Sequence, residues 1–145
     1  MASYKSKRFF SPAFAPGDGC AALNDDKVSL TALALNDTVE FRVEAGQRVS
    51  IIEIQSDDLD SNGTPLLAWK IGYKPINAGS SLVANDSYFG TGLQIGRAAG
   101  RTALSFKPIT FDEPVSLVMT CTAAAATFAA GDIVAVVGSA SVGVR

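Results

Sequence analysis

Short runs of alternating apolar and polar residues dominate the chain from residue 27 onward. Within 39–44, Val39, Phe41 and Val43 alternate with charged residues, and this period of two predicts a strand with one buried face. Similar runs recur between Gly, Asn, Asp and Pro residues, and further strands are expected at 28–33, 49–55, 66–73, 87–89, 93–97, 103–107, 115–122 and 133–137. Closely spaced turn signals of this kind are typical of a sandwich, a jelly roll or a barrel.

The alternation also predicts which side chains share a core. We expect the following residues inside: Val39, Phe41, Val43, Val49, Ile51, Leu117 and Ile133. The one helical candidate is the alanine-rich stretch 123–130, which has no charged face and is too short for a stable isolated helix, so a loop is expected there. The predicted fold class is therefore all-β, a single-domain jelly roll or β-sandwich of about eight strands.

The two ends of the chain do not share this periodicity. Residues 1–26 mix basic residues, aromatics, Pro and Gly without a helical or strand period. We therefore expect an extended N-terminal arm over 1–26, a jelly-roll domain over 27–138 and a C-terminal tail over 139–145.

The composition narrows the possible functions. The 145 residues include no histidine, which removes Ser-His-Asp and Cys-His catalysis and most zinc sites. Twelve Lys and Arg against 14 Asp and Glu give a net charge of −2, so direct nucleic-acid binding is not expected. Only 18% of residues are charged, and apolar residues such as Leu66, Ile71 and Ile76 exceed what one small core obviously holds. This excess favours a protein that works in an assembly.

Cysteine usage and the N-terminus bear on the compartment. Cys20 and Cys121 have no CxxC partner, so two free thiols are expected, while a single long-range disulfide between them stays open. The apolar stretch after Phe10 is broken by prolines and by Asp18, unlike a signal peptide. No segment is apolar enough to span a membrane. We expect a soluble protein made in the cytoplasm.

One acidic cluster carries candidate chemistry. Asp58, Asp60 and Asn62, followed by a glycine, match the start of an EF-hand calcium loop. The match ends at Trp69, which stands where a bidentate glutamate is needed, so a turn between strands is favoured over a metal site. A glycosidase would need Asp57 and its neighbours to converge across a cleft, and nothing in the sequence places them so. We expect no catalysis, no metal and no cofactor.

The N-terminal segment is the strongest candidate for partner binding. It combines three basic and three aromatic residues before the first acidic residue of the chain. Arginine and aromatic side chains are enriched at the energetic centres of interfaces. We expect a docking arm whose contact residues are Tyr4, Lys5, Lys7, Arg8, Phe9 and Phe10. The alternative is a solvated leader without a partner.

Two further segments resemble a known family. Residues 57–73 (DDLDSNGTPLLAWKIGY) and 125–133 (AATFAAGDI) resemble small virion proteins of tailed bacteriophages, in particular the capsid cement or decoration proteins of short-tailed phages. The resemblance covers residues 45–137 and does not include the N-terminal arm.

The resemblance implies a jelly roll without catalysis, placed on the outer surface of a virion. It implies two partners, the major capsid protein and further copies of the same chain as a homodimer or homotrimer. It also leaves open a tail or head-fibre module that binds a host glycan or receptor. That alternative would use Trp69 and Tyr73 as an exposed sugar platform, whereas the strand pattern makes Trp69 partly buried.

Overall fold

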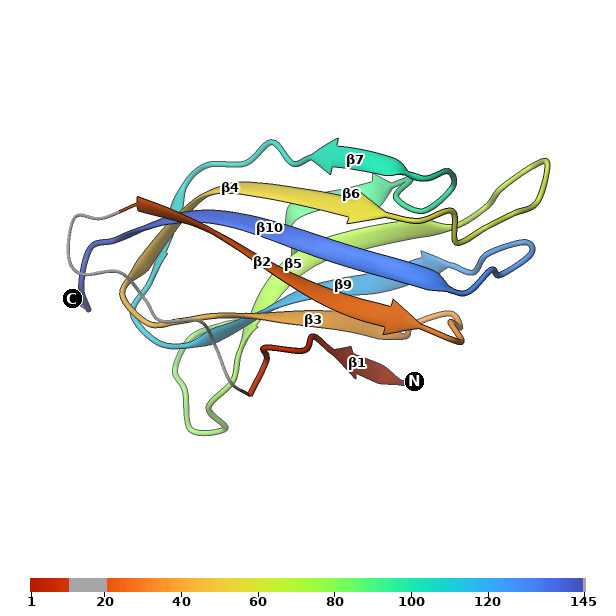
Figure 1. Ribbon diagram of the computed structural model, residues 1–145. Coiled ribbons are helices and arrows are strands. Elements are labelled where there is room, and N and C mark those ends of the chain that lie inside the picture. The colour runs from red at the N-terminus through yellow and green to blue at the C-terminus, as the bar shows by residue number, and fades with distance from the viewer. Residues whose placement is uncertain (11–20, 145) are drawn as a thin grey trace.

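Ten strands form two sheets packed face to face in the computed structural model, which describes residues 1–10 and 21–144 (Figure 1). The described residues contain no helix. In chain order the strands are β1 (Ser3–Lys5), β2 (Ala21–Leu30), β3 (Thr38–Val43), β4 (Gln47–Ser56), β5 (Ala68–Pro75), β6 (Asn85–Leu93), β7 (Gly100–Ala103), β8 (Ile109–Phe111), β9 (Val115–Ala123) and β10 (Gly131–Ser141). This architecture confirms the all-β prediction.

The strand order is that of a jelly roll. One sheet, here called sheet A, has the order β1-β3-β9-β5-β6. The other, sheet B, has the order β2-β10-β4-β7, with β8 also paired to β4. The chain crosses between the sheets from β2 to β3, from β3 to β4 and from β4 to β5, whereas β5 and β6 are neighbours in sheet A. The last two long strands, β9 and β10, each lie between two earlier strands of their sheet.

The core between the sheets follows the predicted alternation, with one exception on β4. Val39, Phe41 and Val43 on β3 are buried, as is Val49 on β4. Ile51 was expected inside, and this is wrong, because its side chain is 47% exposed. Val49 pairs with Ser139 and Ile51 pairs with the adjacent Gly138, which leaves Ser50 as an extra residue in β4. Such a bulge inverts the alternation beyond it, so Ile52 and Ile54 fill the core instead.

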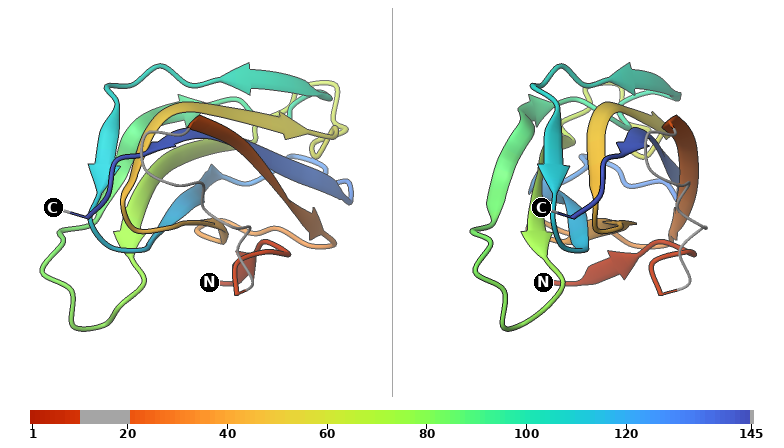
Figure 2. Two further views of the ribbon diagram at one scale, coloured as in Figure 1. Left: turned by 60° about the vertical axis from the view of Figure 1, so that its left-hand side comes forward. Right: turned by 90° about the vertical axis from the view of Figure 1, so that its left-hand side faces the viewer.

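Residues of the predicted N-terminal arm and of the predicted C-terminal tail form strands of the two sheets. β1 pairs in parallel with β3, and β2 begins at Ala21 and not near residue 27. The period of two is hidden in β2 because Asn24 and Asp26 are polar although they line the same cavity as Val137. β10 continues to Ser141, inside the predicted tail. Figure 2 shows β1 lying along the lower edge of the sandwich.

Candidate interaction site

Besides its backbone pairing with β3, β1 is attached to the body of the protein through the side chain of Glu40 of β3. Glu40 points to the outer face of sheet A, yet its side chain is fully buried. The hydroxyls of Ser3 and Ser116 donate to its carboxylate at 2.7 and 2.9 Å. The ammonium groups of Lys5 and Lys74 form ion pairs with the two oxygens, that of Lys74 at 2.7 Å. Lys5 is therefore engaged within its own chain.

The network also fixes the protonation state of Glu40. Burial raises the pKa of this carboxyl, but the hydrogen bonds from Lys5, Lys74, Ser3 and Ser116 outweigh it. Together they lower the pKa of Glu40 from 4.5 to about 2. The carboxylate is thus charged at neutral pH and holds β1 against the sheet.

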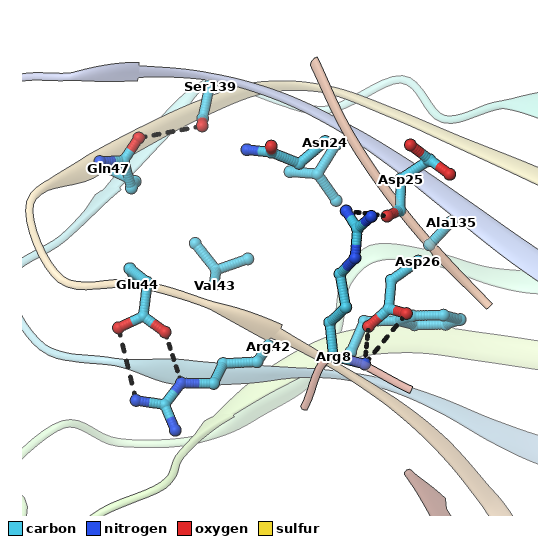
Figure 3. A pocket seen from close by; sticks show the side chains of 12 residues that line it. Arg8, Asn24, Asp25, Asp26, Arg42, Val43, Glu44, Gln47, Ala135 and Ser139 are labelled. Carbon is cyan, nitrogen blue, oxygen red and sulfur yellow. Dashed lines mark hydrogen bonds and ion pairs between the residues drawn. The ribbon is translucent and has the colours of Figure 1, made fainter. Parts of the chain in front are cut away.

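The next residues cover part of the free edge of β2. The backbone N–H of Lys7 donates to the carbonyl of Lys27 at 3.1 Å. The N–H of Arg8 donates to the Asp26 carboxylate at 2.9 Å, and its guanidinium donates to the Asp25 carbonyl at 3.3 Å (Figure 3). The side chains of Lys7 and Arg8 remain exposed.

The two phenylalanines that follow have opposite surroundings. Phe9 is 4% exposed, while Phe10 is 78% exposed. The rings meet edge to face with centroids 5.1 Å apart, and the Lys5 ammonium lies 4.5 Å from the centroid of the Phe9 ring. Phe9 is therefore a fixed base that presents Phe10 to solvent.

The six residues predicted to dock on a partner thus divide into two groups. Tyr4 packs partly buried against the core, Lys5 pairs with Glu40 of the body, and Phe9 is buried next to Lys5 and Phe10. The exposed group, here called the N-terminal patch, consists of Lys7, Arg8 and Phe10. The predicted arm also included residues 11–20, which lie outside the described residues.

Arg8 stands at a small cavity between β2, the edge strand of sheet B, and β3 of sheet A. Phe41, Val43 and Ala135 provide apolar walls, and Asp26 and Glu44 provide polar ones (Figure 3). Its volume of about 70 Å³ is far below the roughly 300–1,000 Å³ of small-molecule sites. The cavity can hold water but offers no room for a typical substrate.

A second hollow, of about 450 Å³, is open and lies along one end of sheet B. Asp57, Arg101 and Asp132 line it. The Asp57 carboxylate accepts the backbone N–H of Asp132 at 2.8 Å, and the Asp132 carboxylate pairs with Lys27 at 2.7 Å. These carboxylates are engaged in local contacts, and Asp58 and Asp60 are not among the lining residues. The convergence that an enzyme built on Asp57, Asp58 and Asp60 would require is not what the geometry shows.

Asp60 joins two loops that lie far apart in the sequence. Its carboxylate accepts four backbone N–H groups, from Leu66, Leu67, Ala126 and Thr127, at 2.8–3.1 Å. Burial raises the pKa of Asp60, but these four donors outweigh it and hold the pKa well below its usual range. The segments 57–67 and 123–130 therefore form one rigid end of the sandwich.

The other members of the acidic cluster serve the same loop. Asp58 accepts the N–H of Asp60 at 3.2 Å, and the Asn62 side chain accepts the N–H of Thr64 at 2.9 Å. Asn62 also donates to the Thr127 hydroxyl at 3.1 Å. In residues 1–10 and 21–144 no group of three or more acidic or cysteine side chains is placed to hold a metal ion.

The burial of Trp69 argues against a sugar-binding platform. Its side chain is 0% exposed, and its indole N–H donates to the carbonyl of Ile95 at 2.9 Å. Tyr73 is partly buried among Tyr88, Phe89 and Phe111. The exposed tryptophan that the glycan-binding alternative requires is therefore not available.

The fold has counterparts among solved structures. No protein-family model and no curated protein matches the chain. A chain in the capsid of Ralstonia phage GP4 superposes with a TM-score of 0.74 at 18% identity, over 96% of this chain and 97% of that one. A chain in the capsid asymmetric unit of cyanophage Pam1 superposes with a TM-score of 0.66 at 21% identity, over 90% and 93%. Both structures are phage capsids. At these identities the likeness establishes a shared fold.

The structure also bears on the cysteines, on membrane spans and on exposed apolar residues. Cys121 is buried and free, and burial raises the pKa of its thiol to about 11, while Cys20 lies outside the described residues. Where the chain is described, no helix is long and apolar enough to cross a membrane. Leu23, which was not among the predicted residues, and Ile51, which was predicted to lie in the core, are both exposed on the outer face of sheet B. Gly138, a small residue within the apolar last strand, is the signal that could have found them.

Proposed function

We propose that the chain is a virion structural protein that binds the outer surface of a phage capsid and cements neighbouring major capsid protein subunits. The observation that carries the proposal is the likeness, over nearly the full length of both chains, to chains of two phage capsid structures. The family resemblance of residues 57–73 and 125–133 points the same way, and these two segments meet around Asp60.

The N-terminal patch is the proposed contact with the shell. Phe10 projects from a buried base, so little conformational entropy is lost when it enters a pocket on a partner. Lys7 and Arg8 beside it add positive charge that would favour an acidic shell surface. Repetition over a shell of many subunits makes modest individual contacts collectively strong.

The proposed role requires no catalytic step and no cofactor, and we infer that the chain is not an enzyme. It also involves no membrane and no direct contact with nucleic acid. Synthesis in the host cytoplasm is part of the same proposal. A tail or head-fibre module that reads a host glycan has less support, because Trp69 is buried.

Binding of the purified protein to shells of the major capsid protein tests the proposal. Phe10→Ala should weaken binding at least about tenfold, since buried aromatics dominate interface energies. Val83→Ala is the matched control, because Val83 is 80% exposed on the loop between β5 and β6, and it should bind like wild type. Equal binding of Phe10→Ala and wild type would show that the patch is not the contact. Failure of wild type to bind any shell would reject the function itself.

Neutralising Lys7 and Arg8 separates their effect on the rate of association with the shell from the effect of Phe10 on the stability of the bound complex. The variant with alanine at both positions should associate with shells more slowly, and its association rate should depend less on salt concentration. The dissociation rate should change less. Deleting the whole segment is a poorer test, because Glu40 would lose its partners Ser3 and Lys5.

A further inference from the structure

The first half of β2 is exposed on both faces as well as along its outer edge. Leu23, Asn24 and Asp25 are exposed, whereas Val28 and Leu30 further along the strand are buried. Among the described strands, β10 is the one that pairs with β2, so the opposite edge of β2 is an edge of sheet B. Such an edge presents main-chain groups that another strand can bind.

The pairing shows which main-chain groups of β2 point outward. The carbonyl of Lys27 accepts the N–H of Lys7 at 3.1 Å, so the main-chain groups of Lys27 point away from β10. In an antiparallel pair these directions alternate along the strand, and the register of β2 with β10 is regular. Leu23 and Asp25 therefore also point outward.

Part of this edge is covered by the chain itself. The N–H of Arg8 donates to the Asp26 carboxylate at 2.9 Å, and its guanidinium donates to the Asp25 carbonyl at 3.3 Å. Within residues 1–10 and 21–144, the N–H of Asp25 and both main-chain groups of Leu23 have no hydrogen-bond partner. A strand from another molecule would continue along residues 21–25 the cover that residues 7–8 provide at 26 and 27.

A cavity lies on the inward side of the same edge (Figure 3). Asn24 and Asp26 of β2 line it together with Phe41 and Val43 of the other sheet. Its volume of about 70 Å³ is roughly half of the 150 Å³ that accommodates benzene, so one short aliphatic side chain has room there. A strand beside β2 would direct every second side chain toward this cavity.

The charge of the edge favours a basic partner. Asp25 is exposed, and the ion pairs among the described residues do not include it. Its carboxylate is turned away from the Arg8 guanidinium (Figure 3). A lysine or arginine directly across from Asp25 would stabilise an added strand. A second copy of β2 fits poorly, because two-fold pairing about this segment would bring Asp25 and Asp26 against the same residues of the other copy.

We propose that an extended segment of the major capsid protein adds as a strand to residues 21–25 of β2. An aliphatic side chain of that segment enters the cavity, and the adjacent residue, a lysine or arginine, lies opposite Asp25. The source of the segment rests on the proposed function, since Arg8 of the N-terminal patch borders both the cavity and this edge. Main-chain hydrogen bonds provide the affinity of such strand addition, and pockets for alternate side chains provide its specificity.

Amide exchange of the full-length protein, followed by NMR, tests the edge without a shell. In the free protein the amides of Leu23 and Asp25 should exchange quickly, and those of Asn24 and Asp26, which point to β10, should exchange slowly. The probe is the peptide Thr-Lys-Val-Lys-Val-Thr with both ends blocked. At millimolar concentration it should slow exchange at Leu23 and Asp25 at least about tenfold. The same peptide with methylated backbone nitrogens at both lysines is the control, and it should have no effect.

Shell binding tests the source of the segment. Leu23→Pro removes an N–H that points away from β10, and proline is tolerated on an edge strand in this position. This variant should bind shells of the major capsid protein at least about tenfold more weakly than wild type. Leu23→Ala keeps the N–H and should bind within about twofold of wild type. If Leu23→Pro does not fold, Asp25→Lys provides the same test, because it places like charges across the added strand.

Four results would overturn the proposal. Slow exchange of the Leu23 and Asp25 amides in the dilute free protein would show that the edge is already covered, and slowing that grows with protein concentration would show that a second copy covers it. The third is a probe peptide without effect at several millimolar, and the fourth is a Leu23→Pro variant that binds shells as wild type does. Failure of wild type to bind any shell would reject the proposed function and the named source, whereas the peptide titration would still decide whether the edge accepts a strand.

Discussion

The two outer faces of the sandwich differ in polarity and in exposure. On sheet A, Glu40 and Ser116 point away from the core but are fully buried beneath the side chains of Lys5 and Lys74. On sheet B, the outward positions of β2 and β4 include Leu23 and Ile51, which are large, apolar and exposed. The polar face is covered by its own chain, and the apolar face is not covered by any described residue.

This difference separates folding from assembly. A buried carboxylate must have its partners within the folded chain, or the fold itself is destabilised. An exposed leucine or isoleucine costs the monomer little and contributes free energy when another molecule covers it. The contacts around Glu40 therefore serve stability, and Leu23 and Ile51 are available for a partner.

The largest expected effect compares two neighbouring isoleucines of β4. Ile52 is buried in the core, so Ile52→Ala should lower the free energy of unfolding by about 2–5 kcal/mol. Ile51→Ala should lower it by less than about 1 kcal/mol, since the side chain lies outside. Chemical denaturation of both variants measures the difference. Equal losses would contradict the bulge at Ser50 and the exposed face with it.

A second comparison sets Glu40 against Glu53, one glutamate from each outer face. Glu40→Ala should cost roughly 3 kcal/mol, the low end for breaking a buried ion pair, because Lys5 and Lys74 can turn to solvent. Glu53 pairs with Arg101, which is 61% exposed, so Glu53→Ala should cost less than about 1 kcal/mol. The free energy of unfolding at neutral pH gives both values. A Glu40→Ala variant as stable as Glu53→Ala would refute the role assigned to the network.

The pH dependence of the folding stability tests the role of the Glu40 charge. The folded-state pKa of Glu40 is about 2, below the ordinary value of 4.5, so its stabilising contribution is complete above 4.5 and is lost as the pH falls toward 2. The stability difference between wild type and Glu40→Gln should shrink over this window and stay constant from pH 5 to 7. Urea titrations at a series of pH values measure it. A difference that does not change with pH would mean that the charge of Glu40 is not what holds β1.

The smallest expected effect concerns calcium. The oxygens of Asp60 already accept four backbone N–H groups, so millimolar calcium or a chelator should leave the Tm unchanged. Asp60→Asn should lower the Tm and speed amide exchange at Ala126 and Thr127. A rise of several degrees with calcium would show that the cluster binds metal after all.

Local pattern predicted much of the fold. The alternation of Val39, Phe41 and Val43 with charged residues gave the correct buried face of β3, and the described residues form ten strands in two five-stranded sheets where about eight strands were expected. The same rule failed at Ile51, because the adjacent Ile51 and Ile52 break the alternation and only the pairing of β4 with β10 decides which of the two faces the core. Register is a property of two strands, and one strand does not reveal it.

The candidate sites were harder to predict, because their contacts join distant parts of the chain. Asp60 looks like a turn residue in sequence, and two of its N–H donors lie on a loop more than sixty residues away. Lys5 and Phe9 look like docking residues, but Lys5 pairs with Glu40 and Phe9 is buried. Of the predicted segment, the N-terminal patch of Lys7, Arg8 and Phe10 is what the fold leaves for a partner.

Electron cryo-microscopy of shells of the major capsid protein, assembled with and without this chain, tests the central claim most directly. Additional jelly-roll density is expected on the outside of the shell only when the chain is present, with the N-terminal patch against the shell. Shells that look the same with and without the chain, or density only on the inner surface, would contradict it.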